Sequence, residues 1–204
     1  MNPRKILSII LMALMLGMPA AAIAAVQTGD AAPDIQFTDT HGKQHKISDF
    51  KGKKVVLEWN NPECPFVKKF YNAKEMQRLQ AEATKAGIVW VTINSSADGK
   101  QGFFADDEAA NAYIKQEGLA STAYVRDTEG KLGKAFGAKV TPHMYVIDAE
   151  GKLAYQGAID SIKSASSADI NKAQNYVLAS LASLKSGEKV TQGSTEAYGC
   201  AVKY

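Results

Sequence analysis

Apolar runs and amphipathic segments alternate along most of the chain. Short continuous apolar runs predict buried strands at residues 55–59, 88–93, 122–126, 144–148 and 153–159. Apolar residues that recur with a period near 3.6 predict helices at residues 65–84, 106–116, 131–136 and 167–184. Because strands and helices alternate, and a turn at 149–152 joins the last two strands as a hairpin, we expect an α/β fold. It should have one mixed sheet with helices on both faces.

The first 24 residues have the pattern of a removable export signal. Arg4 and Lys5 precede an apolar run at 6–18, and residues 22–24 (Ala-Ile-Ala) form a cleavage site. A helix of that run is too short to cross a hydrocarbon core of ~30 Å, so we favour cleavage over the alternative of an uncleaved membrane anchor. The mature protein would then start near Ala25 in the periplasm, an oxidising compartment.

The composition limits the number of domains and the kinds of partner. The chain has 204 residues, 46% of them hydrophobic and 22% charged, which suits one packed domain and excludes extensive disorder. We expect a signal peptide at 1–24, one domain at 25–185 and a polar tail at 186–204. The net charge of +3 includes two positive charges in the signal, so the mature chain is close to neutral. We therefore expect no nucleic-acid partner and, after signal cleavage, no membrane.

The chemistry of the chain centres on one of its two cysteines. Cys64 follows a predicted buried strand and precedes Pro65, and proline is favoured at the first position of a helix. Cys64 is therefore predicted to be the helix N-cap, where backbone N–H groups and the helix dipole lower a thiol's pKa. The positive charge of Lys68 should lower the pKa of this thiol further, whereas the negative charge of Glu63 should raise it. We expect a reactive thiol at this position.

A second short motif, Val-Thr-Pro at 140–142, stands just before a predicted strand. Together with the Cys-Pro helix start, the alternating strands and helices and the hairpin, it resembles the thioredoxin-like superfamily over residues 29–185. The resemblance implies a cis bond between Thr141 and Pro142 that faces the reactive Cys64. By the same resemblance Pro65, Thr141 and Pro142 line the substrate cleft.

Four segments narrow the resemblance. Residues 29–34 (GDAAPD) and 42–52 (GKQHKISDFKG) are similar to the N-terminal hairpin of the alkyl hydroperoxide reductase/thiol-specific antioxidant branch, the redoxins. Residues 64–68 (CPFVK) and 199–204 (GCAVKY) are similar to a peroxiredoxin-like group with the same two motifs. The resemblance implies thiol–disulfide exchange or peroxide reduction, without a metal or organic cofactor, and it allows for a homodimer.

The chain also departs from these families at specific positions. Val67 stands where thioredoxins carry the second cysteine of Cys-x-x-Cys, so no local disulfide can form. Asn61, Leu57 and Pro142 stand where typical peroxiredoxins place a hydroxyl, a proline and an arginine. The side chains that would orient a peroxide are therefore missing.

Cys200 is the other cysteine, and we expect it on a mobile tail. It is the internal candidate to resolve a mixed disulfide or a sulfenic acid formed at Cys64. The alternatives are a permanent structural disulfide between the two cysteines, and a Cys200 thiol that serves an external protein. Glu58, six residues before Cys64, is either a general base acting through a water or a partly exposed carboxylate at a strand end.

These features predict an exported, thiol-dependent oxidoreductase that acts through Cys64. Its substrate would be a thiol or disulfide protein or a peroxide, and an external thiol reductant would reset it. The main alternative is a non-catalytic thioredoxin-like binding module with a structural disulfide. A third hypothesis is a copper-binding chaperone, in which His143 and Met144 would join Cys64 at a metal ion.

Overall fold

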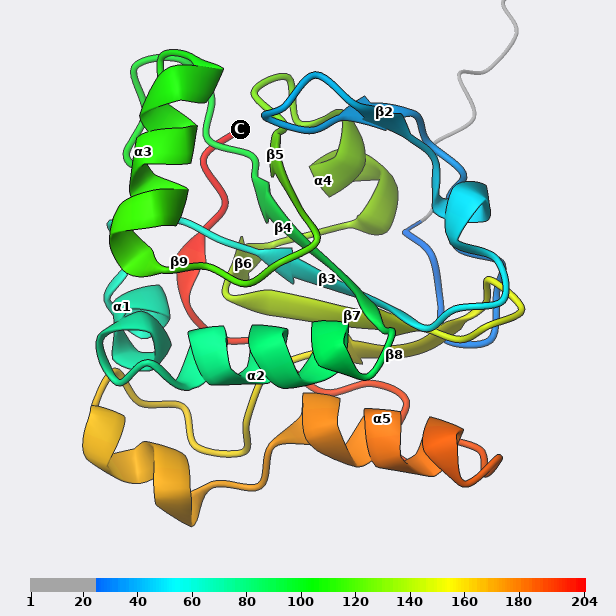
Figure 1. Ribbon diagram of the computed structural model, residues 1–204. Coiled ribbons are helices and arrows are strands. Elements are labelled where there is room, and N and C mark those ends of the chain that lie inside the picture. The colour runs from blue at the N-terminus through cyan, green and yellow to red at the C-terminus, as the bar shows by residue number, and fades with distance from the viewer. Residues whose placement is uncertain (1–24) are drawn as a thin grey trace, which may run out of the picture.

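The computed structural model describes residues 25–204 and is built on a five-stranded mixed sheet (Figure 1). The order of the strands across the sheet is β5–β4–β3–β7–β8. They span Val55–Trp59 (β3), Val89–Asn94 (β4), Ala123–Arg126 (β5), His143–Ile147 (β7) and Leu153–Gly157 (β8). β3, β4 and β5 are parallel, whereas β7 and β8 are antiparallel to their neighbours. The prediction of a mixed sheet with an antiparallel hairpin is confirmed.

Helices cover both faces of this sheet. They span Pro65–Asn72 (α1), Glu75–Lys85 (α2), Asp107–Glu117 (α3), Lys131–Phe136 (α4) and Tyr176–Lys185 (α5), with 3-10 turns at Ile47–Phe50 (η1) and Ser167–Lys172 (η2). α2 and α5 pack on one face, and α4 packs on the other with the N-terminal segment. Every residue of β3 is buried, because both faces of this central strand are covered. The arrangement is the expected thioredoxin-like fold.

Two short strands form the N-terminal extension that the sequence indicates. β1 (Phe37–Thr38) and β2 (Gln44–His45) pair as an antiparallel hairpin outside the main sheet. The proposed signal segment lies outside the described residues. No helix within residues 25–204 has the length and apolar character needed to cross a bilayer.

Two predicted helices are each divided in the structure. The segment predicted as a helix at 65–84 forms α1 and α2, because Lys74 adopts a left-handed conformation with φ 58°. The segment predicted at 167–184 forms η2 and α5, because the Asn175 side chain accepts a hydrogen bond from Leu178 N–H and starts a new helix there.

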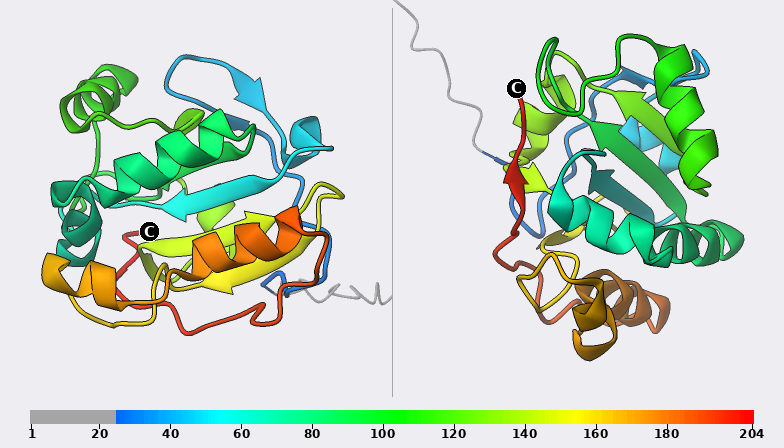
Figure 2. Two further views of the ribbon diagram at one scale, coloured as in Figure 1. Left: turned by 60° about the horizontal axis from the view of Figure 1, so that its bottom comes forward. Right: turned by 90° about the vertical axis from the view of Figure 1, so that its left-hand side faces the viewer.

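The expectation of a mobile tail is wrong for the part that carries Cys200. The tail first runs beside β8, where Gln156 exchanges backbone hydrogen bonds with Gly193 and Thr195. It ends as β9 (Cys200–Ala201), which pairs antiparallel with β6 (Val140–Thr141). Figures 1 and 2 show the tail crossing the molecule to this edge. Backbone pairing and a buried Tyr198 therefore fix the segment.

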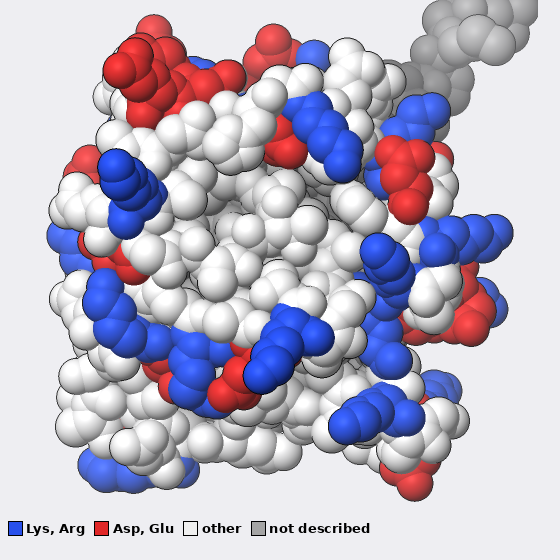
Figure 3. All heavy atoms as spheres, in the orientation of Figure 1, with Lys and Arg blue, Asp and Glu red and all other residues white. Residues whose placement is uncertain are grey.

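Charged side chains of both signs are interspersed on the face drawn in Figure 3. They lie around a centre of uncharged side chains. Neither charge dominates this face, so electrostatic attraction there would not select strongly for a charged partner.

Candidate active site

Cys64 lies at the junction of β3 and α1, as the sequence predicts. It is the N-cap of α1, with Pro65 at the first helical position, and its carbonyl accepts hydrogen bonds from the N–H groups of Val67 and Lys68. The residue has no exposed surface. Its sulfur lies 3.1 Å from the carbonyl oxygen of Thr141, on the segment that enters β7. The helix start and the Thr-Pro motif therefore meet at one sulfur atom.

The tail brings the second cysteine to the same place. The pairing of β6 with β9 sets Cys200 opposite Thr141, and the two cysteine sulfurs are 2.8 Å apart. Both are free thiols. A disulfide has an S–S length of ~2.0 Å, so the two sulfurs need only a small approach to pair if an oxidant accepts the two electrons that the bond releases.

The environment makes the two thiols unequal. Burial by itself would raise the pKa of Cys64, but hydrogen bonds from the Cys200 thiol and the Thr141 side chain favour the thiolate and lower that pKa overall. Burial, together with the hydrogen bond and charge of Cys64, raises the pKa of Cys200 to about 11. Of the two thiols, Cys64 is therefore the more readily ionised.

The predicted cleft residues surround this pair of sulfurs. The Thr141–Pro142 peptide bond is cis, as the resemblance implies. Thr141 and Pro142 are buried beneath the tail, whereas Pro65 is exposed. The Thr141 hydroxyl is buried and has no hydrogen-bond partner within residues 25–204, so it is free to donate to a Cys64 thiolate.

Glu58 is not at an exposed strand end, so that interpretation of the residue is wrong. Its carboxylate is fully buried and accepts hydrogen bonds from four side chains. The donors are Tyr71 (2.6 Å), Trp90 (2.8 Å), Gln80 (3.0 Å) and Thr92 (3.3 Å). Burial raises the pKa of Glu58, and these hydrogen bonds oppose the shift. Within residues 25–204 Glu58 makes no hydrogen bond to Cys64 or Cys200.

The residues of the copper hypothesis lie on opposite faces of the sheet. The His143 ring packs on Tyr145, with 4.6 Å between centroids, and accepts a hydrogen bond from the Lys139 N–H. Met144 faces the other side, in the cluster of buried residues that contains Cys64. Burial lowers the pKa of His143 to about 4. No cluster of three or more His, Cys, Asp or Glu side chains suited to a metal occurs in the described part of the chain.

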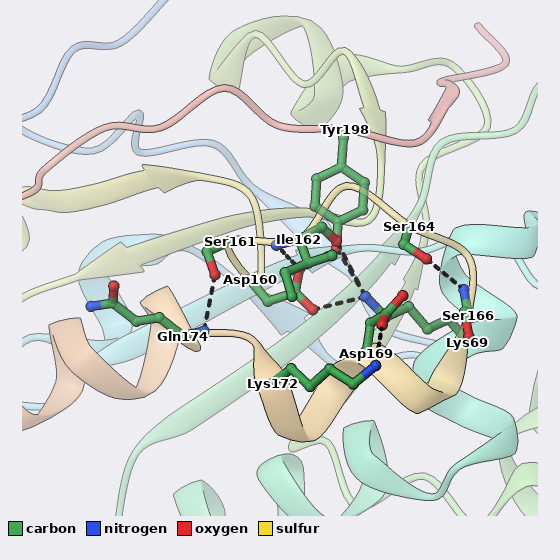
Figure 4. A network of polar contacts seen from close by, with 10 residues as sticks. All are labelled: Lys69, Asp160, Ser161, Ile162, Ser164, Ser166, Asp169, Lys172, Gln174 and Tyr198. Atoms are coloured by element: carbon green, nitrogen blue, oxygen red, sulfur yellow. Dashed lines mark hydrogen bonds and ion pairs between the residues drawn. The ribbon is translucent and has the colours of Figure 1, made fainter.

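A buried polar cluster of Lys69, Asp160 and Tyr198 lies beside the cysteines, and the sequence does not indicate it. The ammonium group of Lys69 in α1 lies 2.9 Å from Asp160, which follows β8, and both side chains are buried. The Tyr198 hydroxyl donates to the same carboxylate and accepts a hydrogen bond from Lys69 at 3.3 Å (Figure 4). The spacing of these residues along the chain gives no signal for such a cluster, because it joins three distant segments.

A buried cysteine at the start of α1, facing a cis-proline beside a mixed sheet, defines a thioredoxin-like protein with a thiol site. The Redoxin family model matches residues 27–175, and the chain belongs to this family. The match ends before α5 and the tail, so family membership by itself does not explain Cys200.

Curated relatives share the central part of the chain. The thiol-disulfide oxidoreductase ResA of Geobacillus thermodenitrificans is 27% identical over 129 residues, which cover 57% of this chain and 73% of ResA. ResA of Bacillus subtilis is 28% identical over 131 residues, which cover 63% of this chain and 66% of that protein.

Solved structures share nearly the whole fold. An uncharacterized conserved protein of Geobacillus kaustophilus has a TM-score of 0.74 and 26% identity, with 93% of this chain and 98% of that one covered. A hypothetical protein of Sinorhizobium meliloti 1021 has a TM-score of 0.71 and 23% identity, with 89% and 96% covered. At 23% identity, the similarity to the Sinorhizobium meliloti protein shows a shared fold alone.

Proposed function

We propose that this protein is an exported thiol–disulfide oxidoreductase in which Cys64 is the nucleophile and Cys200 resolves the intermediate. The observation that carries the proposal is the pair of sulfurs 2.8 Å apart, with a lowered pKa at Cys64 and a raised pKa at Cys200. The names of the ResA relatives support the same class of reaction. In this proposal residues 1–24 are the signal, 25–185 form the catalytic domain and 186–204 form the tail that supplies Cys200.

The reaction follows from the difference between the two thiols. The Cys64 thiolate attacks one sulfur of a substrate disulfide, a new S–S bond forms, and the other substrate sulfur leaves as a thiolate. Cys200 then attacks Cys64, transfers its proton to the first leaving thiolate and releases the second substrate thiolate, which takes a proton from water. The substrate gains two electrons, and the chain loses them as it forms a Cys64–Cys200 disulfide. An external thiol reductant returns the chain to the dithiol.

Peroxide reduction is an alternative reaction for the same two thiols. The thiolate would attack a peroxide oxygen to give a sulfenic acid, and Cys200 would displace water from it. The side chains around Cys64 favour disulfide substrates, because Leu57 and Pro142 carry no polar side-chain group. The side-chain amide of Asn61 is already engaged by Gln101 and Glu63. We therefore propose exchange with protein disulfides as the principal activity and peroxide reduction as a slow one.

A titration against glutathione buffers tests the proposal. The mature protein is equilibrated with mixtures of reduced and oxidised glutathione, and the reduced fraction is measured by acid quench and thiol labelling. We expect a reversible transition within the accessible range of glutathione ratios. A disulfide that stays oxidised throughout would contradict the proposal and support a binding module with a structural disulfide. Cys64→Ser is the control, because it removes the proposed nucleophile and leaves the Cys200 thiol.

A further inference from the structure

The last seven residues occupy the edge of the structure that faces Cys64. Cys200 and Ala201 pair with Thr141 and Val140, and Val202 N–H donates to the carbonyl of Lys139 at 3.0 Å. The tail thus lies on β6 as an added antiparallel strand, its cysteine against the buried sulfur of Cys64. An extended polypeptide that added to this edge would place a cysteine at the same point.

The Lys69–Asp160–Tyr198 cluster fastens this strand to the domain. Lys69 and Asp160 belong to the domain and Tyr198 belongs to the tail, two residues before Cys200. The Tyr198 hydroxyl donates to Asp160 (Figure 4). Tyr198 is 4% exposed, and its ring contacts that of Phe66 edge-on with 5.7 Å between centroids. The three groups therefore join α1 and the segment after β8 to the tail, next to Cys200.

Glycine is required at the residue between Tyr198 and Cys200. Gly199 has a φ of +146°, a conformation that L-residues with a side chain rarely adopt. A Cβ at this position would collide with the carbonyl oxygen of Thr141. The edge of β6 therefore accepts a strand closely only where glycine precedes the cysteine.

We propose that Lys69, Asp160 and Tyr198 form a latch that keeps the tail on β6, and that a partner polypeptide reaches Cys64 by replacing the tail as an extended segment with glycine before its cysteine. This inference rests on the proposed function, because it takes Cys64 as the reacting thiol. When the latch is closed, Cys64 is buried and its sulfur lies 2.8 Å from that of Cys200; when it opens, the same edge is available to the partner.

Opening of the latch can be measured with Cys64 as the single cysteine, in a Cys200→Ser background. The probe is a synthetic peptide with the sequence of residues 196–204, whose cysteine carries nitrothiobenzoate in a mixed disulfide. The Cys64 thiolate attacks the cysteine sulfur of the peptide, the bond between Cys64 and the peptide forms, and the coloured aromatic thiolate leaves. Its absorbance gives the rate directly.

Tyr198→Phe removes only the latch hydroxyl and should raise this rate at least about tenfold, because a hydrogen bond to a charged group is lost. The matched control is Tyr176→Phe, which removes a hydroxyl that makes no hydrogen bond in the described structure, and its rate should equal that of the parent. Equal rates in Tyr198→Phe and the parent would overturn the latch.

A second peptide, with alanine in place of the glycine, tests the docking edge. On the Tyr198→Phe variant it should react at least about tenfold more slowly than the glycine peptide, and equal rates would overturn docking on β6. If Tyr198→Phe folds poorly, hydrogen exchange of the Val202 amide in Asp160→Asn measures the same opening. Faster exchange there, with unchanged exchange in β3 and β4, supports the latch; unchanged exchange at Val202 overturns it.

Oxidised glutathione separates this inference from the proposed function. If Cys64 does not react with it even in the Tyr198→Phe variant, the nucleophile itself is wrong and the proposed function fails. If Cys64 reacts with it but shows no dependence on the latch or on the glycine, only the present inference fails.

Discussion

At the scale of single residues, the site depends on an asymmetry between two thiols. Cys64 and Cys200 are both partly or wholly removed from water, which by itself disfavours a thiolate at either. The hydrogen bond between the two sulfurs lowers the pKa of Cys64 and raises that of Cys200, so a negative charge is favoured on Cys64 alone. The helix start contributes the position of Cys64, but the neighbouring thiol from the tail supplies the largest stabilising contact to its anion.

Removing that contact should change the titration of Cys64. In Cys200→Ala the thiolate loses the Cys200 hydrogen bond, so the pKa of Cys64 should rise and the ultraviolet absorbance of the thiolate should develop at higher pH than in the wild type. Cys200→Ser is the matched control, because its hydroxyl can still donate, and its shift should be smaller. A titration of Cys64 that is the same in the wild type and Cys200→Ala would contradict this assignment.

Glu58 gives a second prediction, on stability. Burial raises the pKa of Glu58 above its ordinary value of 4.5, so the folded state favours the protonated form. The stability that this provides is present at low pH and is lost as the pH rises through the raised pKa. Urea unfolding of wild type and Glu58→Gln should show a free-energy difference that falls as the pH rises. A difference that does not depend on pH would mean that Glu58 titrates alike in both states.

At the scale of elements, the sequence predicts the strands and helices that have a continuous apolar pattern. It does not predict boundaries that depend on the conformation of a single residue. β3 is predicted to the residue, because both of its faces are buried and its apolar run is unbroken. The boundary between α1 and α2 at Lys74 is not predicted, because no glycine or proline marks it. The Cys-Pro motif predicts the position of Cys64, and the cis bond before Pro142 follows from the family resemblance. β6 and β9 are not predicted, because two-residue strands have no periodicity and their pairing depends on contacts distant in sequence.

The buried ion pair between Lys69 of α1 and Asp160 leads to a prediction about stability. Lys69→Met leaves the Asp160 carboxylate buried without its cation, which typically costs ~3–5 kcal/mol of unfolding free energy. Lys68→Met, one residue earlier on the exposed side of the helix, should change the stability by less than ~0.5 kcal/mol. Urea unfolding of both variants measures the difference, and equal small effects would show that the buried pair does not stabilise the fold.

At the scale of the whole molecule, the C-terminal tail comes back to the start of α1 and adds the second sulfur to the site. The two cysteines are 136 residues apart in sequence, and the match to the Redoxin family ends before the tail begins. The tail runs beside β8, is fastened by Tyr198 and ends on β6, so one chain holds both sulfurs. A second copy of the chain is not needed to bring the two sulfurs together.

The central claim is that Cys64 attacks first and Cys200 resolves within the same chain. The most direct test is intact mass with time after one equivalent of oxidised glutathione is added to the reduced mature protein. We predict a transient glutathione adduct, then a monomer lighter by two hydrogen atoms, whose digest contains a Cys64–Cys200 peptide pair. The adduct should persist on Cys64 in Cys200→Ser. An adduct on Cys200 in the wild type, or a disulfide that links two chains, would contradict the account.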